Sequence, residues 1–363
     1  MSAAKRRWVP WSVIGAAVAA AASAQTAPAP RFSGVATTVA VNRSNGMVAV
    51  LAGGTLAVYP SVSAASPASR IELPGRDPRL LEFCGPNLRY VTHDVQGMAQ
   101  VFVAITAEGR ERLAWPNSGL SDLFPTADSR LTRDGKGLYG FLPLDPAARE
   151  YFGLPADIPT GAGVAATFRF AGEKLLARAS SAFAGVVALS PDDMILALGG
   201  GGLMRYRSPG GVAWKREGSG GTWRIADVDQ AAGTVAAIDG AGTVTVTTLE
   251  SGEERGRCAL SGAAVADARL LSDGRVLVLA AGPRPRAAIL DAGTGRPAGE
   301  QPAALFARHG LGSVYDAWLA KASSLDGLVE AGSGAGAALL LHGADGWYLA
   351  PESGGATASP PLP

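Results

Sequence analysis

Short apolar or alternating runs recur along this chain, and each is closed by glycine, aspartate, asparagine or proline. The clearest runs are residues 41–50, 234–238, 243–249, 276–280 and 338–341. Valine, isoleucine, leucine and threonine are prominent in them, which is typical of β-strands. No long segment has helical periodicity, and the 48 glycines and 24 prolines indicate frequent turns. The pattern predicts an all-β protein.

Tight-turn pairs separate the runs at a regular interval. They are Asn45-Gly46, Pro86-Asn87, Asp134-Gly135, Asp192-Asp193, Ala232-Gly233 and Asp273-Gly274. In most of them a glycine is available for the positive φ that such turns require. Three steps are nearly equal: from position 46 to 87, from 193 to 233 and from 233 to 274. Each of these steps matches the ~40–45 residues of a four-stranded propeller blade.

A second series of small turns has the same period. Its members are Pro209-Gly210, Ser251-Gly252, Ala292-Gly293 and Ser353-Gly354. The first two steps of this series are one blade period each, and the last is about half a period longer. The first series lengthens at the same place, because its next turn after position 274 is at position 334. Both series therefore place one insert, of roughly half a blade, between residues 296 and 330.

The two series together predict a seven-bladed β-propeller of four-stranded antiparallel blades. The blades start near residues 36, 77, 122, 182, 222, 263 and 326. The last blade lacks a fourth strand of its own, and we expect residues 31–35 to supply it. Such a closure protects the edges of the first and last sheets. The propeller then spans residues 25–354, and residues 355–363 form a disordered tail.

The turn sequences resemble those of the broad WD40-like, YVTN-like and PQQ-like β-propeller superfamily. Residues 189–197 and 271–277 are similar to its serine-aspartate-glycine turn between inner strands. Residues 249–252 and 290–295 resemble the turn before the outer strand, and residues 211–215 resemble the strand that follows it in PQQ-like repeats. The chain has no Trp-Asp dipeptide and no Gly-His signature. The resemblance therefore implies the propeller fold and no particular cofactor.

The first 24 residues have the three parts of a secretory signal. Lys5, Arg6 and Arg7 precede an apolar stretch over residues 8–22, and Ala22-Ser23-Ala24 offers a cleavage site before Gln25. The apolar stretch is shorter than the ~20 residues of a membrane-spanning helix, although a retained anchor is the alternative. We expect a periplasmic or secreted protein with no transmembrane segment after signal cleavage.

The mature charge excludes one class of partner. The chain has 32 basic and 31 acidic residues, so removal of three basic residues leaves 29 − 31 = −2. A nucleic-acid-binding protein needs a clustered excess of lysine and arginine, so no nucleic-acid partner is expected. Cys84 and Cys258 are too few for a disulfide framework and are interpreted as small buried apolar residues in non-adjacent blades.

No catalytic, cofactor-binding or metal-binding residue is predicted. Residues 199–202 are four glycines, but a strand follows them where a phosphate-binding loop needs a helix. His93, His309 and His342 have no partner at metal-ligand spacing. Residues 227–229, Asp-Val-Asp, lack the glycine and glutamate of a calcium loop and are interpreted as a turn. A Ser-His-Asp arrangement of remote residues stays open.

Two inserts, residues 142–163 and 302–325, interrupt the repeat. In the first, Asp145 and Pro146 predict the start of a short helix. In the second, Val314, Trp318 and Leu325, with Tyr315 and Leu319, follow helical spacing. Aromatic residues and arginine are enriched at protein interfaces, so the candidate partner-binding residues are Arg149, Tyr151, Phe152, Tyr315 and Trp318. The alternative is that these side chains pack the inserts onto the propeller.

Two classes of function fit this sequence. The favoured one is a monomeric exported propeller that binds an unidentified protein or glycan partner, or acts as a scaffold, in the cell envelope. The alternative is an enzyme with a central-channel site, either a lactonase-type hydrolase or a quinone-dependent dehydrogenase. Many innermost-strand positions are alanine, valine or leucine, which counts against such a site. Converging carboxylates in the channel favour the enzyme, and an exposed aromatic patch on an insert favours recognition.

Overall fold

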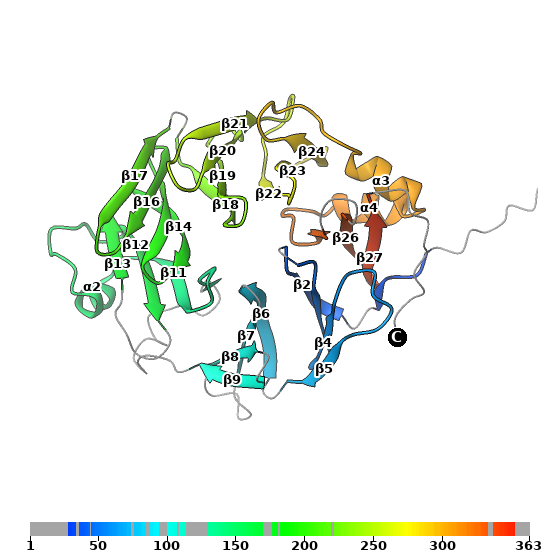
Figure 1. The fold of residues 1–363 in the computed structure, drawn as a ribbon. Helices are drawn as coiled ribbons and strands as arrows, with labels where there is room; N and C mark the ends of the chain where they lie inside the picture. Colours follow the sequence, from blue (N-terminus) through cyan, green and yellow to red (C-terminus); the bar gives the residue numbers. More distant parts are fainter. Residues whose placement is uncertain are drawn as a thin grey trace, which may run out of the picture.

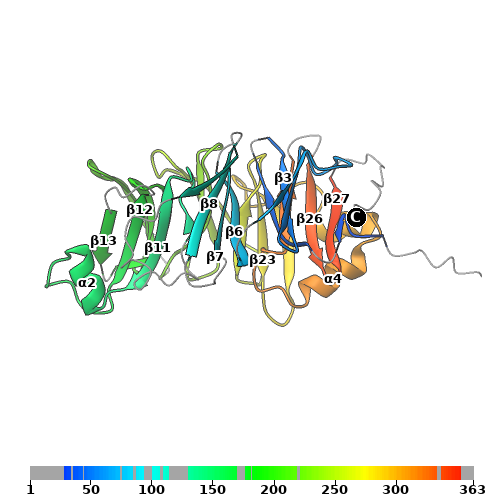
Figure 2. The same cartoon turned by 90° about the horizontal axis from the view of Figure 1, so that it is seen from below.

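Seven antiparallel sheets stand side by side around a central axis in the computed structural model (Figure 1). The structure describes residues 28–33, 36–43, 45–73, 76–84, 87–93, 100–106, 109–113, 130–169, 176–180, 182–218, 221–332 and 337–352. The chain is a seven-bladed β-propeller, as its sequence predicts. Seen from the edge, the sheets form a flat disc (Figure 2). The expected signal segment and the tail at residues 355–363 lie outside the described residues.

In the first six blades the strands run outward from the central channel in chain order, and in the seventh the outermost strand is the first of the chain, β1 (Phe32–Ser33). The first blade contains β2 (Ala36–Val41), β3 (Val48–Ala52), β4 (Thr55–Tyr59) and β5 (Ser69–Glu72). The second contains β6 (Arg76–Cys84), β7 (Asn87–His93), β8 (Gln100–Thr106) and β9 (Gly109–Leu113). The third contains β10 (Arg130–Leu131), β11 (Gly137–Pro143), β12 (Gly163–Arg169) and β13 (Leu176–Ser180). The third predicted start, residue 122, lies outside the described residues.

The next blades keep this order. The fourth contains β14 (Phe183–Ser190), β15 (Asp193–Leu198), β16 (Gly202–Arg207) and β17 (Gly211–Glu217). The fifth contains β18 (Arg224–Asp229), β19 (Thr234–Ile238), β20 (Val244–Thr248) and β21 (Glu254–Cys258). The four glycines at residues 199–202 fall at the turn from β15 to β16, as predicted. The last two blades contain β22 (Asp267–Leu270), β23 (Arg275–Ala280) and β24 (Arg286–Asp291); and β25 (Leu328–Ala331), β26 (Ala338–Gly343) and β27 (Gly346–Pro351).

The burial of each strand follows its distance from the edge of the disc. All five residues of β19 are buried, and so are five of the six residues of β23. These middle strands lie between two neighbouring sheets, so both of their faces need apolar side chains. The outer strand β17 is exposed at several positions, which include Lys215 and Glu217. The apolar runs at residues 234–238, 243–249, 276–280 and 338–341 are therefore middle strands, whereas the run at residues 41–50 contains the turn from β2 to β3.

The ring is closed by the two ends of the chain. Strand β1 (Phe32–Ser33) pairs with β27, with Phe32 opposite Trp347 and Ser33 opposite Gly346. Gly346 has φ +146°, and a Cβ there would overlap the carbonyl oxygen of Phe32. This confirms that a segment before the first blade supplies the fourth strand of the last blade.

The sixth blade departs from the predicted four strands. Its third strand, β24, has no fourth strand beside it among the described residues. The side-chain amide of Gln301 takes that position: Ile289 N donates to Oε1, and Nε2 donates to Ile289 O, both at 3.0 Å. Helices α3 (Pro302–Arg308) and α4 (Gly312–Leu319) follow, and α3 packs beside β24. A side chain and a helix pair thus cover this sheet edge.

The first insert contains the predicted helix, α2 (Pro146–Phe152). The Asp145 side chain accepts a hydrogen bond from Ala148 N at 2.7 Å, and Pro146 occupies the first turn. Leu142 and Pro143 belong to β11, and Gly163 belongs to β12, so the segment between the strands is shorter than the predicted insert. None of the described helices is long and apolar enough to cross a lipid bilayer.

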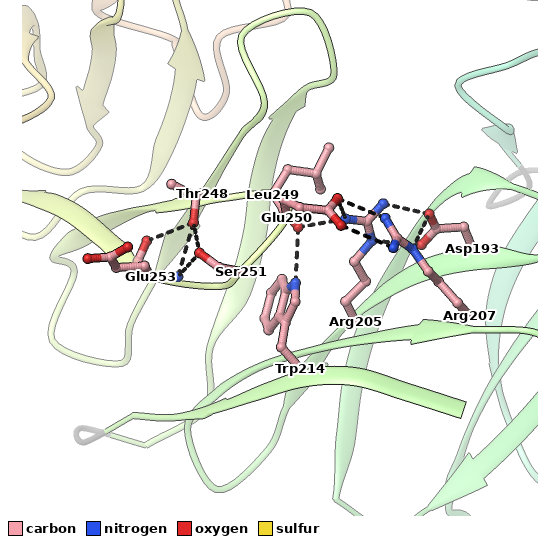
Figure 3. Close-up of polar contacts among 9 residues, drawn as sticks. All are labelled: Asp193, Arg205, Arg207, Trp214, Thr248, Leu249, Glu250, Ser251 and Glu253. Atoms are coloured by element: carbon pink, nitrogen blue, oxygen red, sulfur yellow. Dashed lines mark hydrogen bonds and ion pairs between the residues drawn. The ribbon is translucent and has the colours of Figure 1, made fainter. Parts of the chain in front are cut away.

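An ion-pair network fixes the fourth blade against the fifth (Figure 3). Arg205 on β16 is buried and binds Asp193 Oδ2 at 2.6 Å and the Leu249 carbonyl oxygen at 2.8 Å. The same guanidinium binds Glu250 Oε2 at 3.0 Å, and Trp214 Nε1 donates to Leu249 O at 3.0 Å. Because the buried cation has its hydrogen-bond partners in both blades, movement of one blade past the other would expose an unpaired charge.

Replacing Gln301 with alanine tests the role of its amide at the edge of β24. The Gln301→Ala variant leaves the N–H of Ile289, a fully buried residue, without this partner, while the Ile289 carbonyl oxygen keeps the hydrogen bond from Ala298 N at 3.0 Å. We expect the free energy of unfolding in urea to fall by about 2 kcal/mol. Gln230→Ala, in the exposed turn after β18, is the matched control and should change stability by less than about 0.5 kcal/mol. Equal losses in the two variants would contradict this role.

Candidate functional site

Charged side chains from six blades converge in the central channel. They are Arg43, Glu82, Arg133, Asp227, Arg269 and Glu330, which we call the channel cluster. Each lies on the innermost strand of its blade or just after it. The channel is therefore more highly charged than the alanine, valine and leucine of the innermost strands predicted.

Asp227 is the centre of this cluster and is 4% exposed. Its Oδ2 binds Arg43 Nη2 of the first blade at 2.9 Å, and Arg133 Nη2 of the third blade lies 3.7 Å from Oδ1. Burial opposes ionisation of this carboxyl group, but the charges of Arg43, Arg133 and Arg269 outweigh burial and hold its pKa below the usual value. An ionised Asp227 on the fifth blade thus connects three blades across the channel.

Backbone amides also bind Asp227, and the arrangement is repeated one blade later. Asp227 accepts hydrogen bonds from Val228 N at 2.9 Å and from Leu270 N of the sixth blade at 3.0 Å. Asp267 accepts from Ala268 N at 2.9 Å and from Leu325 N, before the seventh blade, at 2.8 Å. Each carboxylate therefore joins its blade to the next one.

The sequence contained a signal for these carboxylates that was missed. The pairs Ala226-Asp227 and Ala266-Asp267 are separated by one blade period. Residues 227–229 were interpreted as a turn, whereas they belong to strand β18. A bulge between Ile225 and Asp227 shifts the register of this strand, and the sequence pattern did not indicate it.

Two glutamates in the cluster have pKa values above the usual range. Burial raises the pKa of Glu330 to about 7, although two hydrogen bonds from Ser272 and the charge of Arg43 partly oppose the shift. Ser272 N and Oγ donate to the two carboxylate oxygens at 2.8 and 3.0 Å. Burial also raises the pKa of Glu82, against the charges of Arg133, Arg130 and Arg269. Part of the negative charge in the channel is therefore neutralised near neutral pH.

A pocket of about 260 Å³ adjoins the cluster between the innermost strands of blades six, seven, one and two. Arg43, Arg269 and Glu330 are among its polar lining residues. Its apolar lining includes Leu81 and Leu277. The pocket thus combines guanidinium groups with leucine side chains.

A larger groove, of about 590 Å³, lies at the edge of the disc between α4 and the turn from β26 to β27. Helix α4 contributes Val314 and Trp318, and the segment after it contributes Lys321. The turn contributes His342, which is exposed and stacks on Trp347 with ring centroids 4.7 Å apart, and Asp345, which accepts a hydrogen bond from Tyr348. The groove presents an aromatic side chain surrounded by hydrogen-bond donors.

Two of the predicted partner-binding residues lie together at this groove. Trp318 is partly exposed and lines it, whereas Tyr315 is 2% exposed. Tyr315 stacks on Phe306 of α3 at 5.4 Å between centroids and lies 5.8 Å from the Trp318 ring. Tyr315 therefore packs against the Trp318 ring and helps to hold it in place.

The other candidates lie on α2, at the opposite side of the ring (Figure 1). Arg149 donates to the carbonyl oxygens of Pro155 and Ile158, both at 2.5 Å, and so holds the loop after the helix. Phe152 lies 6.2 Å from the ring of Phe168 in the third blade. The side chain of Tyr151 lies outside the described residues. A partner-binding role for all five residues stays a prediction.

The remaining chemically reactive side chains are packed into the structure. Cys84 and Cys258 are free and buried, as predicted, and burial raises their pKa values to about 12 and about 11. Such thiols are poor nucleophiles at neutral pH. His309 Nε2 lies 3.0 Å from the Pro351 carbonyl oxygen, and the side chain of His93 lies outside the described residues. Within the described ranges, no group of three or more histidine, cysteine or acidic residues is arranged to hold a metal ion.

No protein-family model matches the chain, and no curated protein matches it in sequence. Solved structures do resemble it. The β-propeller domain of Cps50 (Swd1) from Myceliophteria thermophila is 10% identical, with a TM-score of 0.45 over 73% of this chain and 85% of that chain. Hsv2 of Kluyveromyces lactis is 10% identical, with a TM-score of 0.38 over 68% and 78%. BamB from Moraxella catarrhalis is 10% identical, with a TM-score of 0.39 over 88% and 83%.

The raised pKa of Glu330 predicts how stability changes with pH. The pKa of Glu330 is about 7 in the folded protein and 4.5 in the unfolded chain. Between these pH values the folded protein therefore retains a proton that the unfolded chain releases. Stability should therefore fall as pH rises from about 4.5 to 7, by about 3 kcal/mol from this residue. Glu330→Gln removes this loss.

Urea unfolding at pH 4.5 and pH 7 measures the difference. Relative to the unaltered protein, Glu330→Gln should gain stability between the two pH values, while Glu253→Gln, on an exposed turn, should not. If the stability of Glu330→Gln changes with pH as that of the unaltered protein does, the pKa of Glu330 is not raised.

Proposed function

We propose that this chain is an exported binding propeller of the cell envelope, and that its edge groove holds a segment of a partner protein. The observation that carries the proposal is the partly exposed Trp318 in a groove of about 590 Å³. Tyr315 and Phe306 hold this ring in place, so binding loses little side-chain entropy. Tryptophan is also among the residues that contribute most to protein interfaces.

The polar groups of the groove favour an acidic peptide as its occupant. Lys321 and the hydroxyl groups of Ser313 and Ser323 supply donors beside Trp318. The Oδ1 oxygen of Asp345 already accepts a hydrogen bond from Tyr348, which leaves Oδ2 as the carboxylate oxygen open to a ligand. Peptide carbonyl groups and acidic side chains fit such donors, whereas the many hydroxyl groups of a glycan also need acceptors.

Converging carboxylates in the channel are the feature that favours an enzyme, but two of the channel carboxylates have a structural role. Asp227 and Asp267 each accept two backbone N–H groups and hold neighbouring blades together. A carboxylate in such contacts is not free to accept a proton from a substrate. One observation favours the alternative, a channel enzyme: the pKa of Glu330, about 7, suits a general acid or base.

Site-specific photocrosslinking tests the proposed groove. With a photoreactive amino acid in place of Ala317, which lines the groove beside Trp318, we expect crosslinks to a peptide rich in acidic residues, and none with the same group at Val212 on the outer strand β17, a residue that is 54% exposed. A synthetic copy of that peptide should bind the purified protein, and Trp318→Ala should weaken binding at least about tenfold. Equal binding by the Trp318→Ala variant, or capture of a glycan, would contradict the proposal.

Export has its own test. Residues 1–24 have the features of a cleaved signal, so the protein recovered from the envelope of a bacterial host should begin at Gln25. Replacing Lys5, Arg6 and Arg7 with glutamate should retain the uncleaved chain inside the cell. Recovery of a full-length chain beginning at Met1 from the envelope fraction would instead indicate a retained anchor.

A further inference from the structure

We propose that the pocket beside the channel cluster binds a small organic carboxylate, held by Arg43 and Arg269 and bordered by the apolar side chains of Val39 and Val329. This site lies at the centre of the ring and shares no lining residue with the edge groove. Its ligand would be a monocarboxylic acid with a short apolar chain.

The two arginines are accessible and keep donors for a ligand. The Arg43 and Arg269 side chains are 33% and 34% exposed, although they lie within the channel cluster. Nη2 of Arg43 donates a hydrogen bond to Asp227, and Nη2 of Arg269 donates one to Asp326. The buried Nε of Arg269 has no hydrogen-bond partner among the described residues. A guanidinium group has five N–H donors, so each retains donors that match the two oxygens of a carboxylate.

The charge balance of the cluster attracts an anion. Three arginines, Arg43, Arg133 and Arg269, face the single negative charge of Asp227. Burial disfavours the ionised forms of Glu82 and Glu330, so these groups neutralise less of the arginine charge than two ordinary glutamates would. Asp326 offsets part of the Arg269 charge, and because Arg43 and Arg269 are only about one-third exposed, water screens the remaining charge less than it would at the open surface.

The size and walls of the pocket define the rest of the ligand. At about 30 Å³ for each water-sized group, a pocket of about 260 Å³ holds about eight such groups. Leu271 and Leu277 of its wall are buried, and its partly exposed apolar side chains are those of Val39 and Val329. A chain of a few methylene groups contacts these side chains, whereas inorganic phosphate leaves them exposed to water.

Glu330 makes binding depend on pH. Its carboxyl group faces Arg43 and Asp273 and accepts both hydrogen bonds of Ser272, while Arg269 and Asp326 line the same pocket. When Glu330 is protonated, a ligand carboxylate meets no like charge from it. When it ionises, the two carboxylates repel each other and compete for Arg43. Binding should therefore weaken as the pH rises through 7.

Calorimetric titration of the mature protein with hexanoate tests the site. Hexanoate has a carboxylate and five further carbon atoms, so it matches the volume of the pocket. We expect saturable binding at one site at pH 6 and affinity lower by up to about tenfold at pH 8, because the protonated fraction of a group with pKa 7 falls about tenfold between these values. Hexanol, which has no charge, and inorganic phosphate, which has no apolar chain, should bind far more weakly.

Variants assign the effect to the named residues. Arg269→Gln should abolish saturable hexanoate binding, while Arg308→Gln, which removes an arginine from the edge of the disc, should not. Glu330→Gln should bind hexanoate with the same affinity at pH 6 and pH 8. The proposal is overturned by absence of binding at pH 6, by equal binding of hexanol, or by a pH dependence that persists in Glu330→Gln. None of these outcomes depends on peptide binding at the edge groove.

Discussion

Closure of the ring is the constraint on which the other features of this protein depend. Each sheet is apolar on both faces, so a blade is buried only if it has a neighbour on either side. The short pairing of β1 with β27 closes the ring, because it joins the first described strand to the last. An open row of these sheets would leave two apolar faces and two strand edges in water.

The charged residues of the channel depend on this closure too. Asp227 is ionised although it is almost fully buried, because Arg43 comes from the first blade and Arg133 from the third. Those arginines reach the fifth blade only in the closed ring. The carboxylate then holds its own blade to the sixth through Leu270 N. Packing of the sheets therefore brings the charges together, and the charges in turn fix the angle between blades.

The second insert connects the two sites that we infer. Its helices cover β24, whose edge is held by Gln301, and α4 forms one wall of the groove at the edge of the disc. The insert ends at Leu325, whose N–H binds Asp267 and whose side chain lines the channel pocket. A change at the edge groove and a change in the channel therefore act on the same segment. Sites on a rigid scaffold commonly use such irregular segments.

The sequence by itself determined the blade period, the position of the inserts, the closure by residues near 31–35 and the helix cap at Asp145. These features depend on local turn chemistry and on apolar periodicity, which neighbouring residues in the chain express. The tertiary structure alone decided that Gln301 replaces a fourth strand and that a bulge turns Asp227 into the channel. It also decided the high pKa of Glu330. Burial and charge at these residues come from other blades, which are remote along the chain, so no local pattern contains them.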